Sequence, residues 1–113
     1  QVNSVIHKNR VYVFAGNTLT VLKKTNGKKL WSQKTECRIE QKYAFDKQNN
    51  IYITGDWEAP IVKINPKGKV MWSTEDTYFC FGHGKIKYKK GKVIVNHEGG
   101  RKVAYSAKTG KEL

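Results

Sequence analysis

The sequence predicts an all-β chain made of three repeated units, each a meander of four short antiparallel strands. Valine, isoleucine, tyrosine and threonine dominate its apolar runs and alternate with polar residues at a period of two, as in half-buried strands. Apolar triplets begin at Val11, Ile51 and Val93, which are 40 and 42 residues apart. Turn glycines recur with spacings of 41 and 42 residues, at Gly27, Gly68 and Gly110. Two independent markers therefore agree on one repeat length.

The same reasoning places the individual strands. In the first repeat, alternating runs separated by turn residues such as Asn26-Gly27 predict strands at 3–7, 10–15, 18–24 and 28–34. In the second repeat, Pro66 stands inside a turn, where its missing N–H costs nothing, and the strands are predicted at 41–46, 50–55, 60–65 and 69–74. In the third repeat they are predicted at 84–88, 92–97, 101–106 and from 110 onward. No window has a sustained helical period.

Four antiparallel strands that recur about every 40 residues are the unit of a β-propeller blade. The predicted fold is therefore about three four-stranded blades in a single domain, with repeats at about 1–36, 37–76 and 77–113. Three blades are too few to close a ring, since propellers use roughly four to eight. The chain is then a section of a longer propeller, a unit completed by copies of itself, or three sheets that close in another way.

The end of each repeat resembles a known family. Segments 25–31 (TNGKKLW) and 106–113 (SAKTGKEL) match the pattern Asp-x-x-Thr-Gly-Lys-x-Leu-Trp of the pyrroloquinoline-quinone-like (PQQ-like) propeller repeat, and 65–72 (NPKGKVMW) resembles its shorter-turn variant. The usual turn aspartate is replaced in all three repeats, and the third stops before its tryptophan. The resemblance implies that Trp31 and Trp72 pack between blades as structural residues.

The resemblance to this family does not imply that the chain binds the quinone cofactor. Quinoprotein dehydrogenases of the wider family hold the quinone and a calcium ion with side chains from many blades, and they use two adjacent cysteines. This sequence has only Cys37 and Cys80, and it lacks Gly-x-Ser-x-Gly, phosphate-loop and His-Glu-x-x-His motifs. We therefore expect no cofactor, no metal and no enzymatic activity in this chain.

The two cysteines stand 43 residues apart, at near-equivalent positions of successive repeats. Equivalent positions in adjacent blades are usually too far apart for a disulfide, which needs Cα atoms within about 7 Å, although a position near the propeller axis would meet that limit. Two buried free thiols are therefore favoured, and a disulfide between Cys37 and Cys80 remains the alternative. Cys80 and His83 alone fall two ligands short of a zinc site.

The composition is strongly basic. The 113 residues include 22 Lys and Arg against 9 Asp and Glu, for a formal net charge of +13. Such a field attracts polyanions, including nucleic acid. The lysines are spread along the sequence, however, and there are only three arginines, the residues preferred for bidentate phosphate and base recognition. An ordinary basic surface is favoured over a nucleic-acid site. No apolar run is long enough for a transmembrane helix.

Candidate binding residues lie in segments that have no counterpart in the other repeats. The loop with Asp56, Trp57 and Glu58 combines an aromatic ring with two carboxylates, a set that suits a sugar face or a basic peptide. Tyr78 and Phe79 lie in the longer connection to the third repeat, and His83 stands between two glycines nearby. The alternative for Trp57 is a structural role, in which its ring packs over the hydrophobic edge of its own hairpin.

These observations lead to two functional hypotheses. The first is a non-enzymatic propeller module of the cell envelope or a secreted protein, which binds a protein or glycan through its loops. The alternative is a fragment of a larger propeller enzyme, a quinoprotein or a hydrolase, or else a basic polyanion-binding domain. A homo-oligomer that completes the ring is a further possible partner arrangement.

Overall fold

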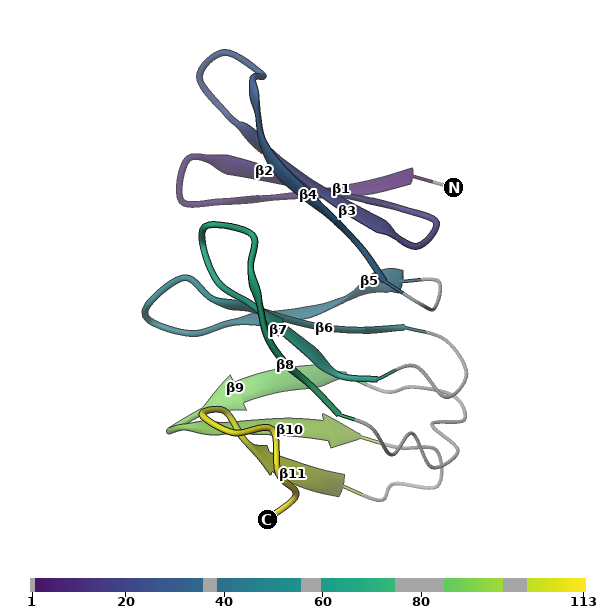
Figure 1. The fold of residues 1–113 in the computed structure, drawn as a ribbon, viewed down its shortest axis with the longest axis vertical. Helices are drawn as coiled ribbons and strands as arrows, with labels where there is room; N and C mark the ends of the chain where they lie inside the picture. Colours follow the sequence, from purple (N-terminus) through teal and green to yellow (C-terminus); the bar gives the residue numbers. More distant parts are fainter. Residues whose placement is uncertain (1, 36–38, 56–59, 75–84, 97–101) are drawn as a thin grey trace.

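The all-β prediction is confirmed. The computed structural model describes residues 2–35, 39–55, 60–74, 85–96 and 102–113, and every regular element among them is a strand. The strands form three separate antiparallel sheets that are stacked along the longest axis of the molecule (Figure 1). No helix in the described part is long and apolar enough to cross a membrane.

Each sheet is a simple meander. The first has the order β1-β2-β3-β4, and its strands are β1 (Val2–His7), β2 (Arg10–Ala15), β3 (Thr18–Lys23) and β4 (Lys29–Lys34). The second has the order β5-β6-β7-β8, with β5 (Ile39–Phe45), β6 (Ile51–Gly55), β7 (Val62–Ile64) and β8 (Val70–Ser73). The third contains β9 (Ile86–Lys89), β10 (Lys92–Asn96) and β11 (Lys102–Ser106).

The predicted twelfth strand, from residue 110 onward, is reduced to an isolated bridge. Tyr105 and Glu112 form an isolated antiparallel bridge, and the Leu113 amide donates to the Ala104 carbonyl over 2.9 Å. The last residues therefore run beside β11 in the place where β4 and β8 lie in the first two sheets. Two pairs do not make a ladder, which is why this segment is not a strand.

Tight turns join the strands within each sheet. Lys8 and Asn9, at φ values of 45° and 68°, form the two-residue turn between β1 and β2. Lys90 and Gly91 do the same between β9 and β10, at 48° and 77°. Two successive positive φ values are what a type I′ turn needs, and its twist matches that of the flanking strands. Lysine in this conformation is unusual, and hairpin pairing on both sides holds it there.

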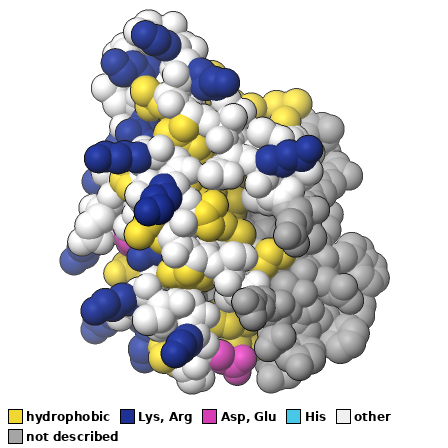
Figure 2. Space-filling model, viewed as in Figure 1, with side chains coloured by type: hydrophobic (Ala, Val, Ile, Leu, Met, Phe, Trp, Pro, Cys, Tyr) yellow, Lys and Arg dark blue, Asp and Glu magenta, His cyan; other side chains and the backbone are white. Residues whose placement is uncertain are grey.

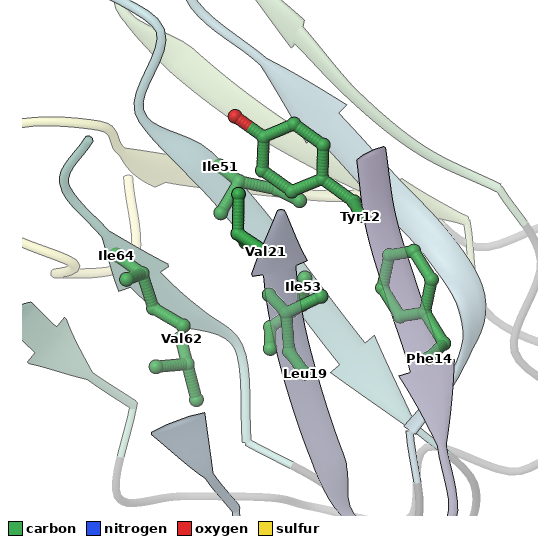
Figure 3. Packing of buried hydrophobic residues seen from close by; sticks show 8 residues of the cluster. All are labelled: Tyr12, Phe14, Leu19, Val21, Ile51, Ile53, Val62 and Ile64. Atoms are coloured by element: carbon green, nitrogen blue, oxygen red, sulfur yellow. The ribbon is translucent and has the colours of Figure 1, made fainter. Parts of the chain in front are cut away.

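The hydrophobic core is divided into two layers, one in each space between sheets. The first layer joins sheets one and two, and its buried members are Tyr12, Phe14, Leu19, Val21, Ile51, Ile53, Val62 and Ile64 (Figure 3). The second joins sheets two and three through Tyr52, Ile61, Ile86, Val93, Val95 and Ala107. Because side chains alternate along a strand, the middle sheet sends Ile51 and Ile53 to one neighbour and Tyr52 to the other. Face-to-face stacking of antiparallel meanders of four, four and three strands confirms the partial propeller.

Candidate functional site

The first junction between sheets is built around Trp31. Its indole is partly buried against the first core layer, and its Nε1–H donates to the Pro66 carbonyl in the turn between β7 and β8, at 3.0 Å. The ring lies so close over Gly68 that a Cβ there would come within 2.6 Å of Trp31 Cγ and Cδ2. Only glycine leaves room for the ring, and it also accepts the φ of +89° at this position.

The second junction repeats the same arrangement one sheet further on. Trp72 Nε1–H donates to the Ala107 carbonyl at 2.8 Å, and a Cβ on Gly110 would lie 2.6 Å from Trp72 Cε3. In both junctions the acceptor is 35 residues beyond the tryptophan. We call this unit, an indole seated on the turn glycine of the next sheet with its N–H on a turn carbonyl, a tryptophan dock.

A cation completes each dock, although it comes from a different strand each time. Arg10 Nη1, at the start of β2, donates to the Pro66 carbonyl at 2.8 Å. Lys63 Nζ, in the middle of β7, donates to the Ala107 carbonyl at 2.9 Å. In each dock, a single carbonyl therefore accepts hydrogen bonds from an indole N–H and from a charged side chain. A charge-assisted bond of this kind is stronger than a neutral one, so it reinforces the junction.

The first sheet presents the receiving half of a dock on its outer side. The turn between β3 and β4 has the same hydrogen bonds as the turn that ends in Gly110: Gly27 N donates to Lys23 O at 2.8 Å, and Gly110 N to Ser106 O at 2.7 Å. Gly27 has a φ of +72°, close to the +78° of Gly110. No described atom lies within 4 Å of a Cβ placed on Gly27.

A buried carboxylate organises the turn between β5 and β6. Asp46 is 8% exposed and accepts four hydrogen bonds, from Gln48 N (2.9 Å), Asn50 N (3.0 Å), Asn50 Nδ2 (2.8 Å) and Tyr52 Oη (2.8 Å). Burial alone would raise the pKa of Asp46, but the bonds from Asn50, Tyr52 and the turn amides outweigh it and lower that pKa. Burial, together with the bond to Asp46, raises the pKa of Tyr52.

Among the described residues, no cluster of side chains fits the metal ion that accompanies a quinone cofactor. No group of three or more His, Cys, Asp or Glu side chains among them is placed to hold a metal. Asp46 is the one buried carboxylate in the described part, and both of its oxygens already accept hydrogen bonds within its own turn.

The sequence-predicted binding residues lie outside the described part of the chain. These are Asp56, Trp57, Glu58, Tyr78, Phe79 and His83, and the same holds for Cys37 and Cys80. They stay predictions. The predicted repeat residues are described, and the structure brings them together in pairs across sheets, Trp31 with Gly68 and Trp72 with Gly110. Sequence reasoning missed this pairing, although a Trp-to-Gly spacing of 37 and then 38 residues was a usable signal.

Lysines gather at one end of the stacked sheets, which the sequence alone did not reveal. We call this the turn end, and it consists of segments 7–10, 23–29, 46–50, 65–69, 89–92 and 106–112, which lie along the left edge of Figure 1. In a meander the first and third turns fall at the same end, so each sheet contributes two turns. Thirteen of the 19 lysines belong to it, all exposed: Lys8, Lys23, Lys24, Lys28, Lys29, Lys47, Lys67, Lys69, Lys89, Lys90, Lys92, Lys108 and Lys111.

Comparison with known families and structures places this geometry. A family model for PQQ-like repeats, described as "Outer membrane protein assembly factor BamB", matches residues 15–113. Among solved structures, the quinohemoprotein alcohol dehydrogenase from Comamonas testosteroni is similar over 97% of this chain, with a TM-score of 0.74 and 19% identity. A europium-containing methanol dehydrogenase is similar over 96%, with a TM-score of 0.76 and 18% identity. No curated protein matches the chain in sequence.

The chain spans only about a fifth of each of these structures, 20% of the first and 23% of the second. The expectation that the chain is non-enzymatic, which was argued from missing catalytic motifs, is therefore wrong. The two solved structures named above are dehydrogenases, so the absence of a catalytic set from a segment of this size does not exclude an enzyme.

Three observations lead to one conclusion: the repeated tryptophan docks, the stacked meanders of four, four and three strands, and the family match over residues 15–113. The chain belongs to the PQQ-like β-propeller family.

Proposed function

We propose that these 113 residues are three consecutive blades of a larger PQQ-type propeller enzyme of the cell envelope, in which they form part of the rigid wall. The observation that carries the proposal is the tryptophan dock, which occurs at both junctions and recurs as an open receiving half at Gly27. A surface shaped to receive an indole on the outer side of the first sheet calls for another blade there. The residues that hold the quinone and perform the chemistry would then belong to other blades.

The fold likeness to two dehydrogenases supports the enzyme class, and the description of the family model supports placement in the envelope. The role of these blades would be mechanical. Each sheet buries a face against the next, and each dock fixes the angle between sheets with two hydrogen bonds and one close ring contact. Such fixed spacing is what an active site assembled from several blades requires.

Substitution of Gly27 tests the missing neighbour. In the natural full-length protein, we expect Gly27→Val to lower the free energy of unfolding by about 3 kcal/mol, because a side chain there would collide with an incoming indole and strain the positive φ. Gly91→Val is the matched control, since Gly91 has a φ of +77° and is equally open. It should cost only the backbone strain, about 1 kcal/mol. Urea unfolding measures both, and equal losses would contradict a blade docked on Gly27.

The enzyme class is tested separately on the full-length protein. We expect it to take up pyrroloquinoline quinone in the presence of Ca²⁺ and then to reduce an artificial electron acceptor when a primary alcohol is added. Equilibrium dialysis measures the uptake, and dye reduction measures the turnover. A protein with the Gly27 result but without quinone uptake would be a propeller of another function, such as partner binding in membrane-protein assembly.

A further inference from the structure

The turn end includes the glycine turns of the docks, and it also carries most of the lysines of the chain. Its thirteen lysines face only two acidic residues within the same segments, Asp46 and Glu112. Asp46 is buried and already bonded, so it screens little of this charge. Six of the nine acidic residues of the chain fall, by sequence, between β4 and β5, β6 and β7, β8 and β9, or β10 and β11. Along the sequence, most lysines and most acidic residues therefore fall in different connections between strands.

The turn end is broad and continuous. The three sheets are stacked along the 42 Å axis of the molecule, and each brings two lysine-bearing turns to the same edge. Figure 2 shows dark blue side chains spread along this edge from top to bottom, with little acidic surface between them. An additional blade would cover the face of a sheet and place an indole on its turn glycine, as Trp31 does on Gly68. The neighbouring lysine would stay exposed, as Lys67 is beside Gly68.

We propose that the turn end docks the protein on an anionic phospholipid surface. A flat row of lysines on short turns can reach many headgroup phosphates at once, and a lysine near an anionic bilayer contributes about a fivefold gain in binding. Lysine is a point charge on a flexible stem, which suits phosphates of unspecified arrangement. This surface does not rest on the propeller being an enzyme.

The same residues favour lipid over nucleic acid. Single-stranded nucleic acid is bound through aromatic rings open to stacking, and the described aromatic residues near the turn end are packed between sheets, with His7 on Phe45 and Tyr52 on Tyr88. Bidentate recognition of base edges favours arginine over lysine, and Arg10, the arginine of the turn end, is bonded to the Pro66 carbonyl.

The exposed large apolar side chains of the described residues lie in strands or at Leu113, and none belongs to the turn-end segments. They are Val2, Ile6, Leu30, Val70, Met71 and Leu113. The turn end should therefore adsorb to an anionic bilayer without inserting into it, and this binding should be electrostatic, reversible and sensitive to salt. This property separates the proposed surface from a hydrophobic membrane anchor.

Vesicle co-sedimentation of the natural full-length protein tests the proposal. We expect binding to phosphatidylcholine vesicles that contain phosphatidylglycerol, no binding to pure phosphatidylcholine, and loss of binding at about 1 M salt, where the Debye length is about 3 Å. Reversing one exposed turn lysine per sheet, with Lys28→Glu, Lys67→Glu and Lys108→Glu combined, should weaken binding at least a hundredfold at about 0.1 M salt.

The matched control carries the same change of net charge away from the turn end. It combines Lys34→Glu, Lys85→Glu and Lys102→Glu, all at exposed positions outside the turn segments. We expect this variant to bind within about fivefold of the unchanged protein. Equal losses in the two triple variants would overturn the proposal, because total charge alone would then govern binding. Tighter binding to single-stranded DNA than to the anionic vesicles at the same salt would also overturn it.

Discussion

Replacing Trp31 with alanine should lower the free energy of unfolding by about 3 kcal/mol, measured by urea denaturation of the full-length protein. The substitution removes the ring that covers Gly68, empties part of the first core layer, and leaves the Pro66 carbonyl without its indole donor. Trp31→Phe, which keeps a ring but lacks the N–H, should cost less, by roughly the 1 kcal/mol of one hydrogen bond plus a smaller area. A Trp31→Ala protein as stable as the original would show that the dock contributes nothing.

The contact between ring and glycine can be isolated by a double-mutant cycle. Gly68→Ala should be strongly destabilising while Trp31 is present, because the new Cβ would lie 2.6 Å from the ring. In the Trp31→Ala background the clash is gone, and only the strain of a positive φ remains, about 1 kcal/mol. Gly16→Ala is the control, since Gly16 has a φ of +60° and open space around it. Additive losses in the double variant would contradict the contact.

Removal of the Asp46 carboxylate should have an effect of similar size, about 3 kcal/mol for Asp46→Ala. Four donors lose their acceptor, and one of them is the hydroxyl of Tyr52, whose side chain is fully buried. Asp46→Asn keeps one acceptor oxygen and should cost less. Glu112→Gln is the control for loss of a negative charge, because Glu112 is exposed, and we expect it to change stability little.

The same carboxylate predicts a dependence of stability on pH. Because the folded-state pKa of Asp46 is lowered, its contribution is complete above the unfolded-state value of about 3.9 and is lost as pH falls through the folded-state value. The difference in unfolding free energy between the original protein and Asp46→Asn should therefore shrink below about pH 4. A difference that stays constant on acidification would mean that the folded-state pKa is not lowered.

Much of the fold could be predicted from the sequence because strands and turns are local. The triplets at Val11, Ile51 and Val93 fall on β2, β6 and β10, and the turn glycines have the positive φ values expected of them. Trp31 and Trp72 each contact a turn of the next sheet. Their contacts with Gly68 and Gly110 were not predicted. Which residue of the next sheet a side chain meets depends on how the two sheets are rotated against each other.

The turn end was missed for a related reason. Along the sequence, lysines alternate with apolar or turn residues and look evenly spread. Only the order of the strands shows that Lys28, Lys67 and Lys108 belong to the same edge of three different sheets. The candidate loop around Trp57 stays a prediction, because it lies outside the described residues.

The tryptophan dock has a direction. The sheet that supplies the indole and the sheet that supplies the glycine use different surfaces, so the contact is heterologous rather than two-fold symmetric. Repetition of a heterologous contact gives a ring when the rotation closes and an open fibre when it does not. With Gly27 open, a blade that carries a matching indole would add to this stack head to tail. Closure of a ring would then give such growth a fixed size.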